Sequence, residues 1–174
     1  MIVLIGATGF IGGEFVRQLR ETRKPFVGIG RRDCNLYDAA SLAKRLGDCE
    51  AACVINCAGY TGKPNVDACE SDKATCLAAN AVLPGVIAQA CEQVGVRWGH
   101  VSSGCIYTGN RSDGAGFREH DPPNFSFRQN NCSFYAGTKA MGEEVLKDAE
   151  LCYIWRLRIP FLQIDSPRNY LSKL

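Results

Sequence analysis

Tyr135 and Lys139 are the residues of this 174-residue chain whose types and spacing most directly indicate chemistry. They lie four positions apart in "FYAGTKAMGEEVL", so in a helix their side chains share one face. An ammonium held near a phenol stabilises the phenolate and lowers the phenol pKa from about 10 toward neutrality, as acid–base catalysis requires. A tyrosine and a lysine at this spacing also occur often by chance, and alone they more often mark a packing or surface contact.

Ser103 and Cys105 form a second pair of candidate side chains, in "SSGCIY" directly after an apolar run that ends at Val101. They are either loop residues without a chemical role or two reactive groups directed into one pocket. Taken alone, Cys105 is more simply a small buried residue, because the chain has ten cysteines and buried thiols are common.

The elements that must position these residues alternate along the chain. Apolar runs predict strands at "MIVLI", "FVGIG", "ACVINCA", "VRWGHVS" and "CYIWRLRI". The predicted helices cover residues 11–19, 39–46, a stretch that ends near Val94, and 134–149. Pro84 is expected to break or kink its helical region near Leu83. This alternation predicts an α/β fold with a doubly wound parallel sheet, as one Rossmann-like domain over residues 1–174.

Ligands of such sheets bind beyond the carboxyl ends of the strands. Four segments follow predicted strands and should therefore lie at one edge of the sheet: "GATGFIGG", "NCAGYTG", "SSGCIY" and "PFLQ". The candidate reactive residues and the glycine-rich turn are thus expected to be neighbours.

The turn "GATGFIGG" places Gly6, Gly9 and Gly12 between the first strand and the first helix. Glycine allows a tight turn and lets backbone N–H groups approach a pyrophosphate, to which the helix N-terminus adds partial positive charge. The spacing alone is a weak signal, but directly after an N-terminal strand it indicates a dinucleotide site. The alternative is a plain strand–helix turn.

Arg31 and Arg32 follow the second predicted strand, where many dinucleotide sites carry an acid for the ribose 2′-hydroxyl. A guanidinium would instead pair with a 2′-phosphate. The sequence therefore favours NADP(H) over NAD(H), unless both arginines are ordinary solvated charges.

Composition excludes several other classes of protein. The net charge is +2 and the basic residues are scattered, so neither nucleic acid nor a membrane is expected as a partner. We identify no stretch of about 18 apolar residues, and the first apolar run is typical of a core strand rather than a secretion signal. The ten cysteines lack C-x-x-C pairs, so no metal site is predicted and a reduced, cytoplasmic protein is expected.

The glycine turn, Ser103 and the Tyr135–Lys139 helix together resemble the extended branch of the short-chain dehydrogenase/reductase superfamily, over essentially the whole chain. Five blocks narrow the resemblance to the 3,5-epimerase/4-reductases of nucleotide-linked rhamnose synthesis, with the dTDP-4-dehydrorhamnose reductases as close relations. These blocks are "AGYTGKPNVDACES", "SSGCIY", "GFREHDPPNFS", "SFYAGTKAMGEEVL" and "LRIPFLQIDSPRNYLSKL".

The resemblance implies catalytic roles. Ser103 would orient the substrate carbonyl, Tyr135 would transfer the proton, and Lys139 would also hold the nicotinamide ribose. Cys105 and Lys173 would form the acid–base pair that inverts C3 and C5 of a 4-keto-6-deoxy sugar, with both pKa values lowered toward neutrality.

The resemblance also implies binding residues. Those expected at the cofactor are Gly6, Thr8, Gly9, Phe10, Ile11, Gly12, Arg31, Arg32, Asn56, Cys57, Ala58, Gly59, Tyr60, Asn80, Tyr135, Lys139 and Pro160. Those expected at the nucleotide sugar are Thr61, Lys63, Asn65, Val66, Ser103, Cys105, Arg168 and Asn169.

Several alternatives stay open. Chains of this family continue past residue 174, so we expect the C-terminal substrate-binding part to be largely missing here. A reductase without epimerase activity and a non-catalytic dinucleotide-binding subunit are the competing hypotheses. The superfamily often forms homodimers, and the sequence does not distinguish dTDP, UDP and GDP.

Overall fold

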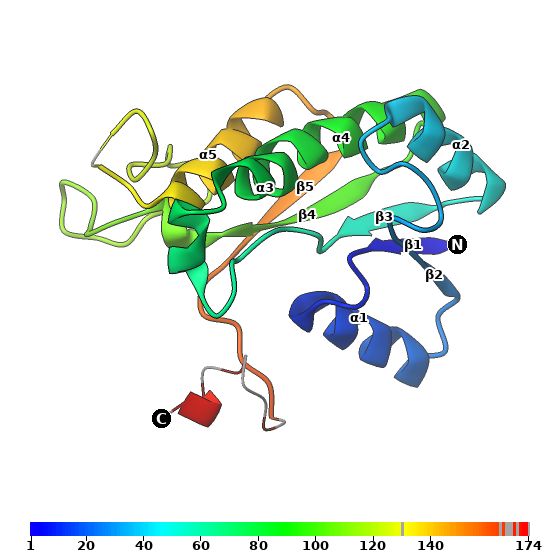
Figure 1. The fold of residues 1–174 in the computed structure, drawn as a ribbon, viewed down its shortest axis with the longest axis horizontal. Coiled ribbons are helices and arrows are strands. Elements are labelled where there is room, and N and C mark those ends of the chain that lie inside the picture. The colour runs from blue at the N-terminus through cyan, green and yellow to red at the C-terminus, as the bar shows by residue number, and fades with distance from the viewer. Residues whose placement is uncertain (130, 164, 166–168, 170, 174) are drawn as a thin grey trace.

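The computed structural model describes residues 1–129, 131–163, 165, 169 and 171–173, and its centre is one five-stranded parallel sheet (Figure 1). The strands are β1 (Ile2–Ile5), β2 (Phe26–Ile29), β3 (Cys53–Asn56), β4 (Trp98–Ser103) and β5 (Cys152–Leu157). Their order across the sheet is β2-β1-β3-β4-β5, and all neighbours are parallel. The predicted α/β doubly wound sheet is confirmed.

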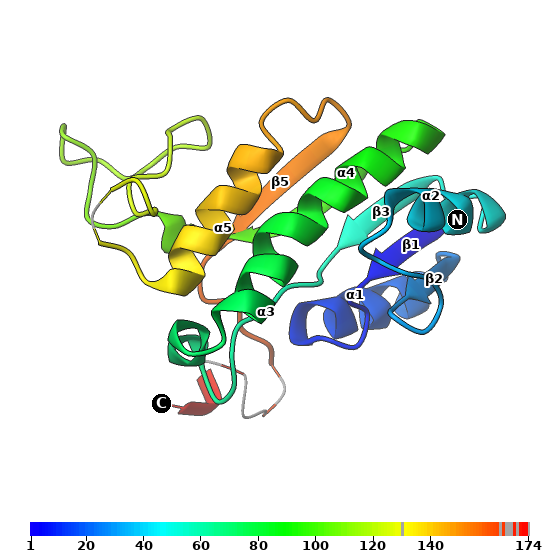
Figure 2. The same ribbon diagram turned by 45° about the horizontal axis from the view of Figure 1, so that its top comes forward.

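Helices lie on both faces of the sheet. They are α1 (Phe10–Glu21), α2 (Ala39–Asp48), α3 (Lys73–Leu77), α4 (Leu83–Val94) and α5 (Phe134–Val145). Figures 1 and 2 show α1 on one face and α2, α4 and α5 on the other. The short helices are η1 (Val66–Glu70), η2 (Ala78–Val82), η3 (Gly104–Ile106) and η4 (Leu171–Lys173). Helix α5 ends at Val145, earlier than the predicted end at Ala149, and a turn leads from it into β5.

The main core lies between the sheet and the helices α2 and α4. Strand residues Val3, Val54 and Trp98 are 0%, 0% and 1% exposed, and they pack with Leu46 of α2 and Ile87 of α4. Removing these side chains from water is the main stabilising contribution to the fold. This core fixes the sheet on which the loops of the carboxyl edge are mounted.

Of the break or kink predicted near Leu83, the break is not found. The helical path continues from Lys73 to Val94, and Pro84 lies in the first turn of α4. The π-helix η2 directly precedes it. A π-turn changes the spacing of the backbone hydrogen bonds and interrupts the α-helical pattern before Pro84. The helix therefore loses little from the missing N–H of this proline.

This continuous helix also corrects the expectation that no stretch is long and apolar enough for a membrane. Lys73–Val94 has 22 residues and is apolar enough, by length and composition, to cross a bilayer. More than half of its most apolar window is buried inside the fold, and the core helix of a soluble protein passes the same test.

Candidate active site

The turn after β1 is shaped by close backbone contacts. Gly6 has φ +81°, and a Cβ added there would lie 2.5 Å from the backbone nitrogen of Ala58. The Gly9 N–H donates to the Gly6 carbonyl at 3.0 Å, and no side chain caps the N-terminus of α1. A glycine-rich turn that leads into a helix N-terminus without a side-chain cap fits a pyrophosphate. The predicted cofactor segments around Gly6 and Ala58 are therefore in contact.

The remaining predicted residues of this turn lie at the start of α1. Thr8 is exposed, Phe10 and Ile11 are half-buried, and Gly12 is buried. A Cβ on Gly12 would overlap the carbonyl oxygen of Gly6, which requires glycine at this position.

Arg31 and Arg32 lie in the exposed turn that follows β2. Within the described residues neither forms an ion pair. The turn also contains Asp33, whose carboxylate accepts a hydrogen bond from the Gly30 N–H at 2.8 Å. The turn after β2 therefore carries charges of both signs, whereas the sequence pattern indicated basic charge alone.

Ser103 and Tyr135 meet at the carboxyl edge of β4. The Ser103 hydroxyl forms a hydrogen bond with Tyr135 and accepts another from the Cys105 N–H at 3.2 Å. Tyr135 is the second residue of α5, which the Ser133 side chain caps by accepting from the Ala136 N–H at 3.2 Å. A phenol and a hydroxyl in contact are the arrangement expected for protonating a carbonyl oxygen.

Lys139 lies one turn further along α5 and is 5% exposed. Its Nζ donates to the carbonyl of Val101 at 3.0 Å, and a Cβ added at Gly59 would lie 3.9 Å from this nitrogen. Burial lowers the pKa of Lys139 to about 8, and the Glu143 carboxylate opposes this shift.

The expected lowering of the Tyr135 pKa is not found. Burial raises the pKa of this phenol to about 12, although the hydrogen bond with Ser103 lowers it. Desolvation disfavours the phenolate more than the neighbouring groups stabilise it, so the phenol is protonated at neutral pH.

Asn80 joins the loop after β3 to α5. Its side chain accepts from the Tyr60 N–H at 2.9 Å, donates to the Tyr60 carbonyl at 2.9 Å, and donates to the Thr138 hydroxyl at 3.2 Å. Thr138 in turn donates to the Tyr135 carbonyl at 2.9 Å. Asn80 therefore holds the predicted cofactor loop against the helix that carries Tyr135.

Asn56 orders the start of the same loop. Its side-chain oxygen accepts from the Ala58 N–H at 2.9 Å, and its amide nitrogen lies 3.0 Å from His100 Nδ1. Burial lowers the pKa of His100 to about 3, so the ring is neutral and accepts the amide proton. Cys57 is half-buried, and burial raises its pKa to about 11.

Cys105 is half-buried in η3. It lies near enough to Tyr135 and Lys139 to affect the pKa values of both residues. The side chain of its predicted partner Lys173 lies outside the described part of the chain, as does Arg168.

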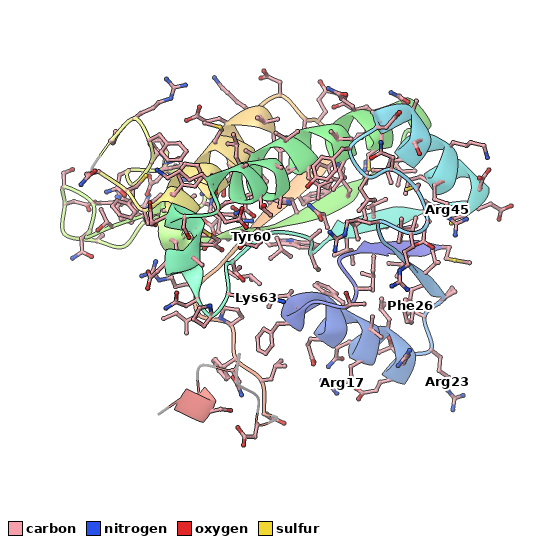
Figure 3. All side chains as sticks on the ribbon, in the orientation of Figure 1. Arg17, Arg23, Phe26, Arg45, Tyr60 and Lys63 are labelled. Carbon is pink, nitrogen blue, oxygen red and sulfur yellow. The ribbon has the colours of Figure 1, made fainter. Side chains whose placement is uncertain are left out.

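The predicted sugar-nucleotide residues differ in their surroundings. Lys63 lies on the loop after β3 (Figure 3). Thr61 and Lys63 are exposed, and Val66 is 40% exposed. Asn65 caps η1 by accepting from the Asp67 N–H at 3.0 Å. Asn169 is 2% exposed and holds the backbone of Leu162, accepting from its N–H at 3.0 Å and donating to its carbonyl at 2.7 Å. Pro160 lies exposed after β5.

A buried ionic cluster that the sequence patterns did not predict lies behind the site. Glu143 is 7% exposed, accepts a hydrogen bond from the Ser102 hydroxyl, and pairs with Arg156 at 2.8 Å. Two signals were available: Arg156 interrupts an apolar strand, and Glu143 lies four residues after Lys139 on the same helical face.

Comparisons with known proteins identify the family of the chain. A sequence profile of the RmlD substrate binding domain matches residues 1–174. A trifunctional UDP-glucose 4,6-dehydratase/UDP-4-keto-6-deoxy-D-glucose 3,5-epimerase/UDP-4-keto-L-rhamnose-reductase of Arabidopsis thaliana is 34% identical over 99% of this chain and 25% of its own length. A bifunctional dTDP-4-dehydrorhamnose 3,5-epimerase/dTDP-4-dehydrorhamnose reductase of the same plant is 34% identical over 99% of this chain and 56% of its own.

A solved structure shows the same fold. The UDP-rhamnose synthase from Acanthamoeba polyphaga mimivirus superposes with a TM-score of 0.86 at 23% identity, over 99% of this chain and 61% of that one. The chain thus spans between a quarter and about three-fifths of these relatives. With its whole length matched, the chain belongs to the RmlD substrate binding domain family.

Proposed function

We propose that this chain carries the cofactor site and much of the catalytic site of an NADPH-dependent 3,5-epimerase/4-reductase that acts on a nucleotide-linked 4-keto-6-deoxy sugar. The observation that carries the proposal is the hydrogen bond between Ser103 and Tyr135, with buried Lys139 one turn along the same helix. The names of the Arabidopsis relatives support the choice of reaction and substrate class.

The chain's own residues fit a nicotinamide dinucleotide. The glycine turn and the N-terminus of α1 would hold the pyrophosphate, and Lys139, close to Gly59, would hold the nicotinamide ribose. Arg31 and Arg32 would pair with a 2′-phosphate, which favours NADP(H). When bound, the cofactor supplies the hydride that reduces C4 of the sugar.

Reduction needs a proton at the C4 oxygen. The phenol of Tyr135, with its pKa raised to about 12 by burial, is protonated at neutral pH and serves as the acid. Ser103 orients the carbonyl toward this phenol. The Lys139 ammonium, one turn along the same helical face, would stabilise the phenolate left after proton transfer.

The same carbonyl makes the protons at C3 and C5 acidic. Cys105 and Lys173 would act on opposite faces of the sugar, one removing a proton and the other returning one, so that each centre is inverted through an enolate. The position of Cys105 beside Tyr135 and Lys139 supports a single pocket for both reactions.

Tyr135→Phe tests the reduction. Loss of the phenolic proton should lower kcat for NADPH oxidation with a 4-keto-6-deoxy nucleotide sugar by about 10²–10⁴-fold. Tyr153→Phe is the matched control, because that side chain is 58% exposed on β5. Turnover in Tyr135→Phe equal to that of the control would contradict the proposal.

Cys105→Ala tests the epimerisation. Solvent deuterium should no longer enter C3 or C5, while reduction of an already epimerised substrate continues. Unchanged deuterium entry would remove Cys105 from the acid–base pair. Reduction without any deuterium entry in the wild type would identify a reductase alone. NADPH binding without turnover of any keto sugar would favour a non-catalytic subunit.

A single domain over residues 1–174, a homodimer and a cytoplasmic location remain predictions from the sequence.

A further inference from the structure

Glu143 is a buried carboxylate that lies one helical turn after Lys139. It is held from three sides: by α5, by the Ser102 hydroxyl of β4, and by the Arg156 guanidinium of β5, whose Nε and Nη2 lie 3.0 and 2.8 Å from one Glu143 oxygen. Burying a carboxylate costs free energy. We therefore ask what this one contributes beside a predicted catalytic lysine.

Arg156 is itself fixed at its other end. Its Nη1 donates to the Tyr107 hydroxyl and to the Glu119 carbonyl, both at 2.6 Å. Both side chains of the Glu143–Arg156 pair are therefore held in place by hydrogen bonds to neighbouring groups.

The groups that act on Lys139 come from α3, α5, β4 and η3. His100 of β4 is neutral, because burial lowers its pKa to about 3. Cys76 of α3 and Cys105 of η3 also act on Lys139. Tyr135 of α5 is a protonated phenol, because burial raises its pKa to about 12. Among the described groups that act on Lys139, Glu143 is the one carboxylate. Its effect on the Lys139 pKa is second in size after the effect of burial.

We propose that Glu143 is a positioning residue that keeps the buried Lys139 side chain charged and directed toward the Val101 carbonyl, while Arg156 and Ser102 fix the carboxylate. The inference rests on the proposed function for the use of Lys139, but the electrostatic coupling itself does not. In a site with little water, this carboxylate replaces part of the hydration that the ammonium has lost.

Two substitutions that break the same ion pair distinguish this proposal from a structural role. Glu143→Gln removes the negative charge and leaves Arg156 positive, so the pKa of Lys139 should fall by about one unit or more. Arg156→Gln leaves the carboxylate without its guanidinium, so the pKa of Lys139 should rise. If the pair only stabilised packing, both variants would admit water and raise the pKa of Lys139 together.

The measurement is an NMR titration of the full chain labelled with ¹³C at lysine Cε, with the Lys139 signal assigned from Lys139→Arg. Glu144→Gln is the matched control, because Glu144 is the next residue of α5 and pairs with exposed Arg128 at 3.0 Å. This control should leave the Lys139 titration unchanged, and Glu143→Asp should restore much of the wild-type value. If Glu143→Gln does not fold, a Lys139 pKa that falls or stays unchanged in Arg156→Gln still overturns the proposal.

Activity provides the second readout. The alkaline limb of kcat/KM against pH should move down in Glu143→Gln and up in Arg156→Gln. Failure of the wild type to bind NADPH would contradict the proposed function, and the NMR titration would still judge the role of Glu143. Turnover in the wild type with no opposed shifts would reject the role of Glu143 alone.

Discussion

The glycine turn after β1 and the first half of α5 lie at the same edge of the sheet, but different forces hold them. The turn is shaped by backbone contacts: Gly6 has a positive φ and no room for a Cβ against Ala58. The helix is held by buried polar and charged groups, with Lys139 at 5% exposure and Glu143 at 7%. Shape determines the first region and electrostatics the second.

This difference decides how each region responds to substitution and to pH. A steric site tolerates changes of pH but not an added methyl group. A site built from buried charges gives up stability to keep those charges, and it should respond to protonation. Substitutions can therefore separate the two regions.

Gly6→Ala is expected to have the largest effect on stability. The new Cβ would lie 2.5 Å from the Ala58 nitrogen at a φ of +81°, so the turn and the loop after β3 must move apart. Strain and overpacking together should lower the free energy of unfolding by about 3 kcal/mol and abolish NADPH binding. Urea unfolding and a fluorescence titration with NADPH measure both effects, which should not depend on pH.

Gly13→Ala is the matched control for that substitution. A Cβ there meets nothing within 4 Å, and the residue is exposed in α1. Alanine should therefore stabilise the helix by about 0.5–1 kcal/mol. If both variants lose stability equally, close backbone contact does not explain the glycine at position 6.

Lys139→Met should abolish activity and raise stability. In the unfolded chain this lysine has its ordinary pKa of 10.5, but in the folded protein its pKa is about 8 because burial disfavours the ammonium. Below pH 8 the folded state therefore carries a penalty of about 3 kcal/mol at most, which methionine removes. Part of this gain is lost because Glu143 then lacks the neighbouring charge.

The pH dependence has a definite sign. The unfolded chain binds more protons at this residue, so wild-type stability rises relative to Lys139→Met as pH increases from about 8 to about 10.5. Urea unfolding at pH 7 and pH 10.5 should show a large gap between the proteins at the first pH and a small one at the second. A gap that does not change with pH would mean that packing, and not the buried charge, separates the variants.

The same contrast explains what the sequence predicted. Strand runs and the glycine spacing reflect short-range sterics, so the sheet and the turn followed from local patterns. The pairing of Ser103 with Tyr135 followed only from the family resemblance. The helix does not break at Pro84 because the π-helix η2 directly precedes α4, and that geometry has no local signature. The raised pKa of Tyr135 and the Glu143–Arg156 pair depend on burial by segments far apart in the chain, which spacing does not reveal.

Arg31 and Arg32 are neither closely packed nor buried. Their substitution should therefore have the smallest effect among these predictions. Both are exposed after β2, so their attraction for a 2′-phosphate is screened by solvent and salt. Each change to alanine should weaken NADPH binding by about tenfold at low ionic strength and leave NADH binding unchanged. Fluorescence titrations with both dinucleotides at two salt concentrations test this expectation.

Arg20→Ala is the control, because it removes the same charge from the last turn of α1. It should weaken neither dinucleotide, since it lies at the opposite end of α1 from the glycine turn. An equal loss of NADPH and NADH affinity in Arg31→Ala would show that the arginines act on the pyrophosphate through net charge. The preference for NADP(H) would then be removed, while the assignment of the glycine turn, which rests on backbone geometry, would stand.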